Sequence, residues 1–259
     1  MVRVAPAPYR LFEPGQAVVA RDGSVLVAER GTRNRVTRVD PASGRVSRFA
    51  TELADPFGLA FAPDGALLVA GDGGLFRVSE AGRDPELFAA VDAGPIAVES
   101  ASTILYANEN EVGLLDTGTG RTHVLPVAVS APYALALDPT AHFLLVSDTG
   151  NHRILRIDLG FETATILAAG LRTPLGMVVE PSGSIVVAEY AAGTLTRIAP
   201  DGKQATVASG FDKPYSLARA SDGTIYVVEA GQLGSPSGRL ERVSPSGVVS
   251  RVKLEITES

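Results

Sequence analysis

Apolar and polar residues alternate in short stretches along the whole chain, and this pattern itself repeats. A short apolar stretch, a turn such as "PDG" or "PSG" and a β-branched stretch such as "SIVVA" recur about every 40 residues. Short apolar stretches joined by turns of this kind predict β-hairpins. No part of the chain shows the spacing of apolar residues that is typical of an amphipathic helix. The pattern therefore predicts an all-β protein made of a repeated unit.

The repeated unit occurs six times, and each copy ends in an acidic residue, a glycine or an asparagine. The six units begin at Pro14, Pro56, Ala93, Pro132, Pro174 and Pro214. A third and a fourth strand are predicted after each hairpin. Four strands in a repeat of about 40 residues indicate a β-propeller, in which neighbouring blades bury each other's apolar faces. We therefore expect one domain over residues 1–259, a six-bladed β-propeller of four-stranded antiparallel blades.

Closure of the ring is predicted at the two ends of the chain. The segment "YRLF", residues 9–12, stands where a fourth strand would precede the first unit. An unpaired last blade would expose strand edges. We therefore expect this segment to pair with the last blade beside "VSRVKLE", residues 249–255.

Two stretches of the repeat resemble known propeller families. "SDTGNHRILRID", residues 147–158, resembles the NHL repeat, with its acidic residue, Gly-Asn turn and arginine-bearing strand. "VAEYAAGTLTRIAPDG", residues 187–202, is similar to the streptogramin-lyase (virginiamycin B lyase) group. The resemblance covers nearly the whole chain and implies a six-bladed propeller near the streptogramin-lyase-like and gluconolactonase-like proteins. These motifs specify a fold rather than a reaction.

In a four-stranded blade, the loop between the second and third strands opens on the same face as the links between blades, so two sets of residues should meet there. The second position of each unit, near the channel, carries Gly15, Phe57, Gly94, Tyr133, Leu175 and Tyr215. The end of each second strand carries Glu29, Gly71, Asn108, Asp148, Glu189 and Glu229. An apolar, aromatic mouth with a few convergent polar groups is typical of a small-molecule site.

Roles follow from these positions. The predicted substrate-binding residues are Phe57, Tyr133, Leu175, Tyr215, Glu29, Asn108 and His152. The predicted catalytic residues are Glu189, Glu229 and Asp148, since partial desolvation beside aromatic rings raises the pKa of a carboxyl group towards values useful in proton transfer. The same residues allow a structural interpretation. The carboxylates could cap their own loops, the aromatic rings could plug the channel, and His152 could be a turn residue.

The residues that the sequence lacks limit the metals and cofactors that the protein could bind. There is no cysteine, which removes thiolate nucleophiles, disulfides and Cys-ligated zinc. The gluconolactonase-like propellers hold a divalent cation with acidic and amide side chains before or early in the first strand. This chain has Phe57, Tyr133, Leu175 and Tyr215 at those positions, so we expect no cofactor and no metal site of this kind, and a divalent cation bound elsewhere stays an open alternative. Streptogramin lyases combine histidine with glutamate on the channel face, where this chain offers glutamates and His152.

Charge and hydropathy set the expected partners and location. A net charge of −6 argues against nucleic acid, which requires a dense cationic surface. No apolar stretch approaches the ~20 residues of a membrane-spanning helix, and "MVRVAPAPYR" lacks the apolar core of a signal peptide. We therefore expect a cytoplasmic monomer with a small-molecule ligand and no membrane or nucleic-acid partner.

Two functions remain open at this level. The leading hypothesis is an enzyme of biosynthetic type that binds a fairly apolar organic substrate at the channel mouth. It would perform redox-neutral acid–base chemistry as a lyase, cyclase or isomerase. The alternative is a non-catalytic NHL scaffold that binds a protein, a peptide or a metabolite on the same face.

Overall fold

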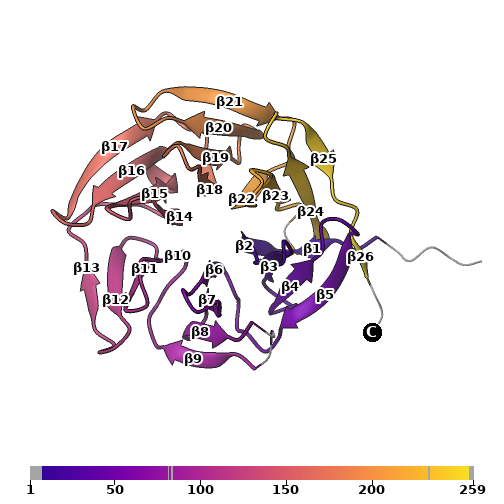
Figure 1. Cartoon of the computed structure of the whole chain (residues 1–259), viewed down its shortest axis with the longest axis horizontal. Helices are drawn as coiled ribbons and strands as arrows, with labels where there is room; N and C mark the ends of the chain where they lie inside the picture. The colour runs from indigo at the N-terminus through magenta and orange to yellow at the C-terminus, as the bar shows by residue number, and fades with distance from the viewer. Residues whose placement is uncertain (1–7, 81, 83, 233, 257–259) are drawn as a thin grey trace, which may run out of the picture.

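The computed structural model describes residues 8–80, 82, 84–232 and 234–256, and these form six β-sheets arranged as the blades of a ring (Figure 1). Within each blade, successive strands pair antiparallel from the central channel outward. The six-bladed all-β propeller predicted from the repeat is therefore confirmed. The helical element in the described part of the chain is a short 3-10 turn, Thr149–Asn151, so no helix there is long or apolar enough to cross a membrane.

The strands follow the repeat closely. Blades 1 and 2 contain β2 (Pro14–Val19), β3 (Val25–Glu29), β4 (Arg35–Val39), β5 (Arg45–Ala50), β6 (Gly58–Phe61), β7 (Leu67–Gly71), β8 (Gly74–Val78) and β9 (Glu86–Ala89). Blades 3 and 4 contain β10 (Ile96–Val98), β11 (Thr103–Ala107), β12 (Val112–Asp116), β13 (Thr122–Val124), β14 (Pro132–Leu137), β15 (Phe143–Asp148), β16 (Arg153–Asp158) and β17 (Thr163–Ala169). Blades 5 and 6 contain β18 (Pro174–Val179), β19 (Ile185–Glu189), β20 (Thr194–Ile198), β21 (Gln204–Ser209), β22 (Pro214–Arg219), β23 (Ile225–Glu229), β24 (Pro236–Val243) and β25 (Val249–Arg251).

The core lies between neighbouring blades. Every residue of the second strands β3, β19 and β23 is buried, because both faces of these strands are covered. Leu26 of β3, for example, packs in one cluster with Leu59 and Val69 of the next blade. Outer strands such as β13 and β17 are largely exposed. This arrangement explains the nearly continuous β-branched stretches of the second strands, since a strand buried on both faces needs no polar alternation.

The ring is closed by the N-terminal segment, as the sequence predicted. Strand β1 (Leu11–Phe12) pairs antiparallel with β24, with Leu11 opposite Gly238 and Phe12 opposite Pro236. Strand β25 pairs with the same edge of β24, farther along it. The amide of Tyr9 donates to the Leu254 carbonyl at 2.9 Å, so the segment lies beside the C-terminal strand region.

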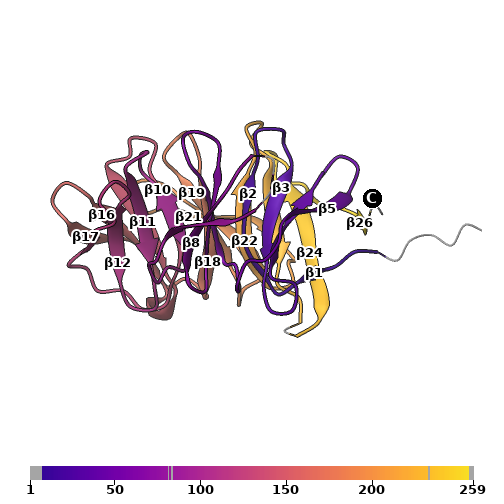
Figure 2. The same ribbon diagram turned by 90° about the horizontal axis from the view of Figure 1, so that it is seen from below.

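A second connection between the chain ends was not predicted. Strand β26 (Glu255–Ile256) pairs parallel with β5, the outer strand of the first blade, with Glu255 opposite Arg45. The N-terminal segment therefore completes the last blade, and the C-terminal segment extends the first. Figure 2 shows β1, β5, β24 and β26 together at one side of the ring. The N-terminal segment thus covers a strand edge of the last blade, and the C-terminal segment covers a strand edge of the first blade. Both edges would otherwise be exposed.

Candidate functional site

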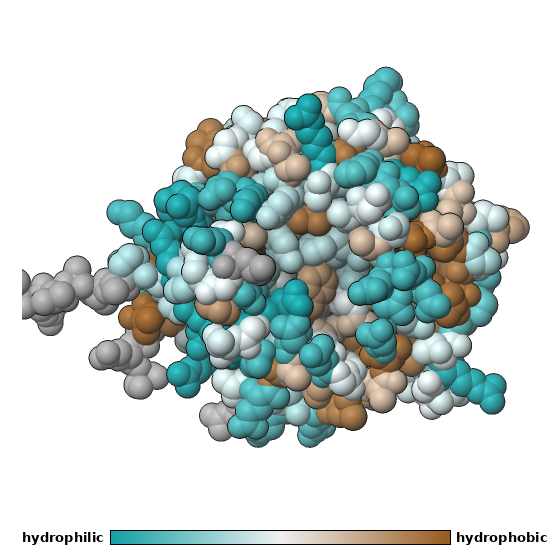
Figure 3. Space-filling model, turned by 180° about the vertical axis from the view of Figure 1, so that it is seen from behind, coloured by the Kyte–Doolittle hydropathy of each residue, from teal (hydrophilic) through white to brown (hydrophobic). Residues whose placement is uncertain are grey.

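The predicted face carries a cavity of about 700 Å³. Figure 3 shows this face, hollowed near its centre and surrounded by hydrophilic side chains. The residues that line the cavity are Arg30, Asp55, Phe57, Gly71, Asp72, Asp92, Ala93, Gly94, Pro95, Asn108, Glu109, Asn110, Glu111, Ala131, Pro132, Tyr133 and Tyr215. Most of them belong to blades 2 and 3 and to the links around those blades, so the cavity lies to one side of the channel.

Aromatic rings from three blades form the floor of the cavity. The ring centroids of Phe57 and Tyr133 are 5.0 Å apart, and those of Tyr133 and Tyr215 are 4.9 Å apart, both edge to face. Behind this contact, the Gln16 amide nitrogen donates to the Tyr133 carbonyl at 3.0 Å, and its side-chain oxygen accepts from the Leu59 amide at 3.3 Å. The rings therefore pack against one another and present an aromatic surface to the cavity.

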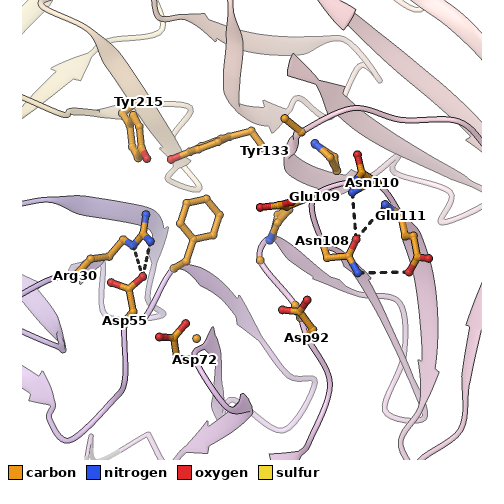
Figure 4. A pocket seen from close by; sticks show the side chains of 17 residues that line it. Arg30, Asp55, Asp72, Asp92, Asn108, Glu109, Asn110, Glu111, Tyr133 and Tyr215 are labelled. Atoms are coloured by element: carbon orange, nitrogen blue, oxygen red, sulfur yellow. Dashed lines mark hydrogen bonds and ion pairs between the residues drawn. The ribbon is translucent and has the colours of Figure 1, made fainter. Parts of the chain in front are cut away.

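The hydroxyl of Tyr133 is a buried polar atom within this floor. It has no hydrogen-bond partner among the described residues, although the Tyr215 side chain lies beside it (Figure 4). Burial, together with the neighbouring Tyr215, raises the pKa of Tyr133 well above its ordinary value. The hydroxyl is therefore neutral over the physiological range.

One side of the cavity is strongly acidic. Figure 4 shows the side chains of Asp72, Asp92 and Glu109 around the floor. All three are exposed, and no hydrogen bond or ion pair holds their carboxylates among the described residues. Asn108 shapes the turn that presents Glu109: its side-chain oxygen accepts from the amide of Glu111 at 3.1 Å.

The cation of the cavity is already paired. Arg30 donates through Nε to Asp55 at 3.0 Å and through its terminal nitrogen to the same oxygen. Burial opposes ionisation of Asp55, but the hydrogen bonds from Arg30 and the Gly31 amide outweigh it and lower the pKa of Asp55. The Arg30 guanidinium also lies over the Phe57 ring, 5.5 Å from its centroid. Arg30 and Asp55 thus form a neutral pair beside the aromatic floor.

The three carboxylates predicted to be catalytic lie elsewhere, and so does Glu29, which was predicted to bind substrate. Glu29, Asp148, Glu189 and Glu229 are 0–8% exposed, and none of them lines the cavity. Each accepts a hydrogen bond from a backbone amide in the segment that leads into its own blade. The donors are Phe12 at 2.8 Å, and Ser130, Arg172 and Asp212 at 2.7 Å. These four residues therefore cap the ends of the second strands and fix the segment before the first strand.

The caps differ in how fully they are satisfied. Glu29 also accepts from the Tyr9 hydroxyl at 2.5 Å, from Arg35 at 3.1 Å and from Arg33 and Thr37. In Asp148, the carboxylate is held by Arg153 at 2.6 Å and by the Asn151 amide at 2.9 Å.

The other two caps have fewer partners. Glu189 accepts from Thr196 besides the backbone amide. Glu229 is the least satisfied, since Arg239 is 3.8 Å away and one carboxylate oxygen is buried without a hydrogen bond. Burial raises the pKa of Glu229 above its ordinary value, and the nearby Glu241 carboxylate adds to this effect.

The structure thus divides the residues predicted to bind substrate. Phe57, Tyr133, Tyr215 and Asn108 line the cavity, whereas Glu29, Leu175 and His152 do not. Leu175 is buried. His152 ends the 3-10 turn in a left-handed conformation, with its amide donating to the Thr149 carbonyl.

Several cavity residues were missed from the sequence: Arg30, Asp55, Asp72, Asp92, Glu109 and Glu111. The sequence does contain a signal for two of them. Two of the six units end in a residue without a carboxylate, Gly71 and Asn108, and Asp72 and Glu109 directly follow these residues.

The described acidic side chains of the cavity are not grouped for cation coordination. No group of three or more His, Asp or Glu side chains in the described part of the chain is placed to hold a metal ion. The acidic side chains of the cavity are therefore separated from one another rather than gathered around a point. The set does not fit the divalent-cation site of gluconolactonase-like propellers.

Comparisons with known proteins show similarity in fold. No family model matches the sequence, and no curated protein is significantly similar to it. The structure is similar to that of a streptogramin B lyase, with a TM-score of 0.69 at 18% identity, over 97% of this chain and 87% of the other. It is similar to a calcium-binding protein, regucalcin from Agrobacterium tumefaciens, with a TM-score of 0.76 at 16% identity, over 98% of both chains.

A third similar structure is a nidogen/laminin complex, with a TM-score of 0.74 at 16% identity over 86% of this chain and 90% of the other. The resemblance expected from the repeat is thus confirmed at the level of the propeller fold. Proteins of this fold serve different purposes, so the site must carry the functional argument.

Proposed function

We propose that this protein binds a small organic molecule in the cavity at the channel mouth. The observation that supports this most strongly is the cavity of about 700 Å³, which has an aromatic floor and a polar wall. Its volume is in the range of ordinary ligand pockets, and rings packed edge to face provide a rigid apolar surface for a ligand. Phe57, Tyr133 and Tyr215 would contact the apolar part of the ligand, and Asn108 would help to shape the wall.

A test of this proposal can use Gly94, which lines the cavity. A Cβ atom added there would meet the Ala107 carbonyl oxygen at 3.5 Å and the Phe57 ring at 3.9 Å, which are ordinary contacts. A Gly94→Leu variant should therefore fold and fill part of the cavity. We expect ligand-observed NMR with a panel of aromatic and aliphatic amines, alcohols and carboxylates to give fragments that bind the wild type and not this variant.

The matched control is Gly118→Leu, which makes the same change in a surface turn of blade 3, away from the cavity. A Cβ there would meet only the Asp116 side chain, at 3.4 Å. The control should bind the same fragments as the wild type. If no fragment binds the wild type, or if the fragments that bind are indifferent to Gly94→Leu, the cavity is not a ligand site.

Acid–base catalysis in the same cavity is a second candidate function. Asp92 and Glu109 have exposed carboxylates with no partner among the described residues, and they lie near the aromatic floor. A free carboxylate beside a bound substrate can act as a general base. The fold likeness to a streptogramin B lyase is compatible with redox-neutral chemistry of this kind. The capping carboxylates are poorly suited to it, because they are buried and do not line the cavity.

Conversion of bound fragments tests this candidate. Compounds that bind in the first experiment are incubated with the protein and followed by proton NMR and mass spectrometry. A lyase, cyclase or isomerase would change the spectrum without oxidation or reduction, and Glu109→Gln or Asp92→Asn would slow the change at least tenfold. The control Glu86→Gln removes an exposed carboxylate from β9 and should leave the rate unchanged. Absence of conversion of every compound that binds would leave binding as the function.

A further inference from the structure

We infer that the ligand of the cavity is an organic cation, an amine or ammonium compound with an apolar body. This inference rests on the proposed function and assigns the chemical class of the ligand. It follows from the separation of two kinds of surface within one cavity: aromatic rings at the floor, and carboxylates without cationic partners on the wall.

The electrostatic argument starts from the charged residues that line the cavity. Arg30 is the cation among the described lining residues, and its charge is balanced by Asp55 at 3.0 Å. Asp72, Asp92 and Glu109 have no such partner. A cavity lined mainly by one sign of charge concentrates ligands of the opposite sign. An anionic ligand would have to compete with Asp55 for Arg30 while facing the free carboxylates.

The aromatic floor adds a second, independent preference. The face of an aromatic ring attracts cations, and the attraction is stronger where water is partly excluded. The protein itself provides an example in the cavity, since the Arg30 guanidinium lies 5.5 Å from the centroid of the Phe57 ring. In each edge-to-face pair one ring covers part of a face of the other, and Arg30 lies over the Phe57 ring, so a ligand cation would use the part of the ring surface that these contacts leave in the cavity lining.

The buried Tyr133 hydroxyl is a further polar group at the floor. It has no hydrogen-bond partner among the described residues and belongs to a cavity-lining side chain. Because its pKa is raised well above the ordinary value, it remains a neutral hydroxyl, which can both accept and donate a hydrogen bond. It can accept from an ammonium N–H and could equally donate to a carboxylate, so it does not choose between the two. The acidic wall and the aromatic floor are therefore the two observations that favour an ammonium group over an anion.

Three compounds of nearly equal size test the inference: 3,3-dimethylbutylamine, 3,3-dimethylbutan-1-ol and 3,3-dimethylbutanoate. They share one apolar body and differ in charge at pH 7. We expect the amine to bind the wild type about tenfold more tightly than the alcohol at low ionic strength, and the butanoate to bind most weakly. Raising the salt concentration should narrow the difference, because exposed charges are screened.

Variants locate the preference on the acidic wall. Asp92→Asn combined with Glu109→Gln should reduce the preference for the amine over the alcohol to about threefold or less, with little change for the alcohol. The matched control is Glu86→Gln, which removes an exposed carboxylate outside the cavity and should leave the preference intact.

The outcomes separate this inference from the proposed function. Equal binding of the three compounds, or tighter binding of the butanoate, overturns the inference but leaves a ligand site that Gly94→Leu still blocks. Binding of none of the three, while other fragments bind in a manner sensitive to Gly94→Leu, also overturns the inference alone. A preference for the amine that survives the double variant would show that the acidic wall is not its source.

Discussion

Blades 1, 4, 5 and 6 differ from blades 2 and 3 in how the second strand ends, and this difference accounts for the position of the cavity. In the first group, which we call the capped blades, a buried carboxylate accepts a hydrogen bond from a backbone amide of the segment that precedes the blade. In the second group, the open blades, the corresponding residues are Gly71 and Asn108. The cavity lies over the open blades. The departures from the repeat, rather than its recurring residues, mark the candidate site.

Close packing explains why blade 2 has no cap. A Cβ atom at Gly71 would lie 2.5 Å from the Ala54 carbonyl oxygen and 3.2 Å from the Pro56 Cα. The segment before the blade is instead held by backbone, since the Asp72 amide donates to the Ala54 carbonyl at 2.8 Å. In blade 3, Asn108 bonds to its own turn. Without a carboxylate that reaches across to the preceding segment, both blades leave room at the channel mouth.

The largest effect is expected from Glu29→Gln, which weakens the cap at the ring closure. Glu29 is fully buried and accepts from Tyr9, Arg35 and the Phe12 amide, among others. Replacing one carboxylate oxygen by an amide nitrogen leaves buried donors without an acceptor and two arginines without their counter-charge. Loss of one partner of a buried ion pair costs about 3–5 kcal/mol. Urea denaturation at pH 7 should show a free energy of unfolding lowered by this amount.

The same substitution in the open blades is the matched control. Glu109→Gln changes an exposed side chain without a described partner, so its unfolding free energy should stay within about 0.5 kcal/mol of the wild type. Similar losses for both variants would remove the distinction between capping and cavity carboxylates.

A pair of glycine substitutions examines the packing that separates the two groups. Gly71→Ala should destabilise the protein by about 1–3 kcal/mol, because the new methyl group has no room beside the Ala54 carbonyl. Gly94→Ala, one blade farther along the ring, should change stability by less than about 0.5 kcal/mol, since its Cβ meets nothing closer than 3.5 Å. Thermal unfolding of the two variants measures the contrast. Equal tolerance at both positions would contradict the explanation given for the missing cap in blade 2.

The fold was predictable because its causes are local and repeated. Six hairpin units spaced about 40 residues apart specify blades, and an apolar segment before the first unit specifies the closing strand. The parallel pairing of β26 with β5 was not predictable in this way. It involves two exposed residues, Glu255 and Ile256, which show no apolar alternation. Their pairing depends on where the ring brings the chain ends together.

The site was only partly predictable, and the reason is geometric. The aromatic positions follow from the repeat, which brings Phe57, Tyr133 and Tyr215 to the channel. The repeat does not tell whether a carboxylate at the end of a second strand faces the cavity or the segment before its blade. In the capped blades, the backbone amide that donates to this carboxylate lies 17 or 18 residues earlier in the chain, so the pairing cannot be recognised from neighbouring residues.

One sequence feature does accompany the caps. In three of the capped blades an arginine of the third strand stands opposite the carboxylate: Arg35, Arg153 and Arg239. The open blades have no such pair among their described strands, since Gly71 stands opposite Gly74 and Val112 begins the third strand of blade 3. An acidic residue followed by an arginine across the turn therefore predicts a structural carboxylate in this protein.

A pH experiment distinguishes the caps from one another. Burial raises the pKa of Glu229, so the folded state binds this proton more tightly than the unfolded state. The resulting stabilisation is fully present below the ordinary glutamate pKa and is lost as the pH rises through the raised value. Glu229→Gln removes this dependence. The melting temperature of the variant minus that of the wild type should therefore increase from pH 4 to pH 7.

Glu189→Gln is the control for that experiment. Glu189 is held by the Arg172 amide and by Thr196, and neither of its oxygens is left without a partner. We expect it to cost about 1–3 kcal/mol at pH 7, whereas Glu229→Gln should cost less than about 1 kcal/mol. A larger loss for Glu229→Gln than for Glu189→Gln at pH 7 would show that its buried oxygen has a donor after all.

The smallest effect is expected at the floor of the open blades. Tyr133→Phe removes a buried hydroxyl that has no hydrogen-bond partner among the described residues, and it leaves the ring contacts with Phe57 and Tyr215 in place. Deleting an unsatisfied polar group costs nothing in hydrogen bonding, so the free energy of unfolding should stay the same or rise by up to about 1 kcal/mol. Tyr9→Phe is the matched change in a capped blade, where the hydroxyl donates to Glu29 at 2.5 Å, and it should lower stability. If Tyr133→Phe destabilises the ligand-free protein as much as Tyr9→Phe does, the hydroxyl is already satisfied without a ligand and has no free hydrogen-bonding capacity to offer one.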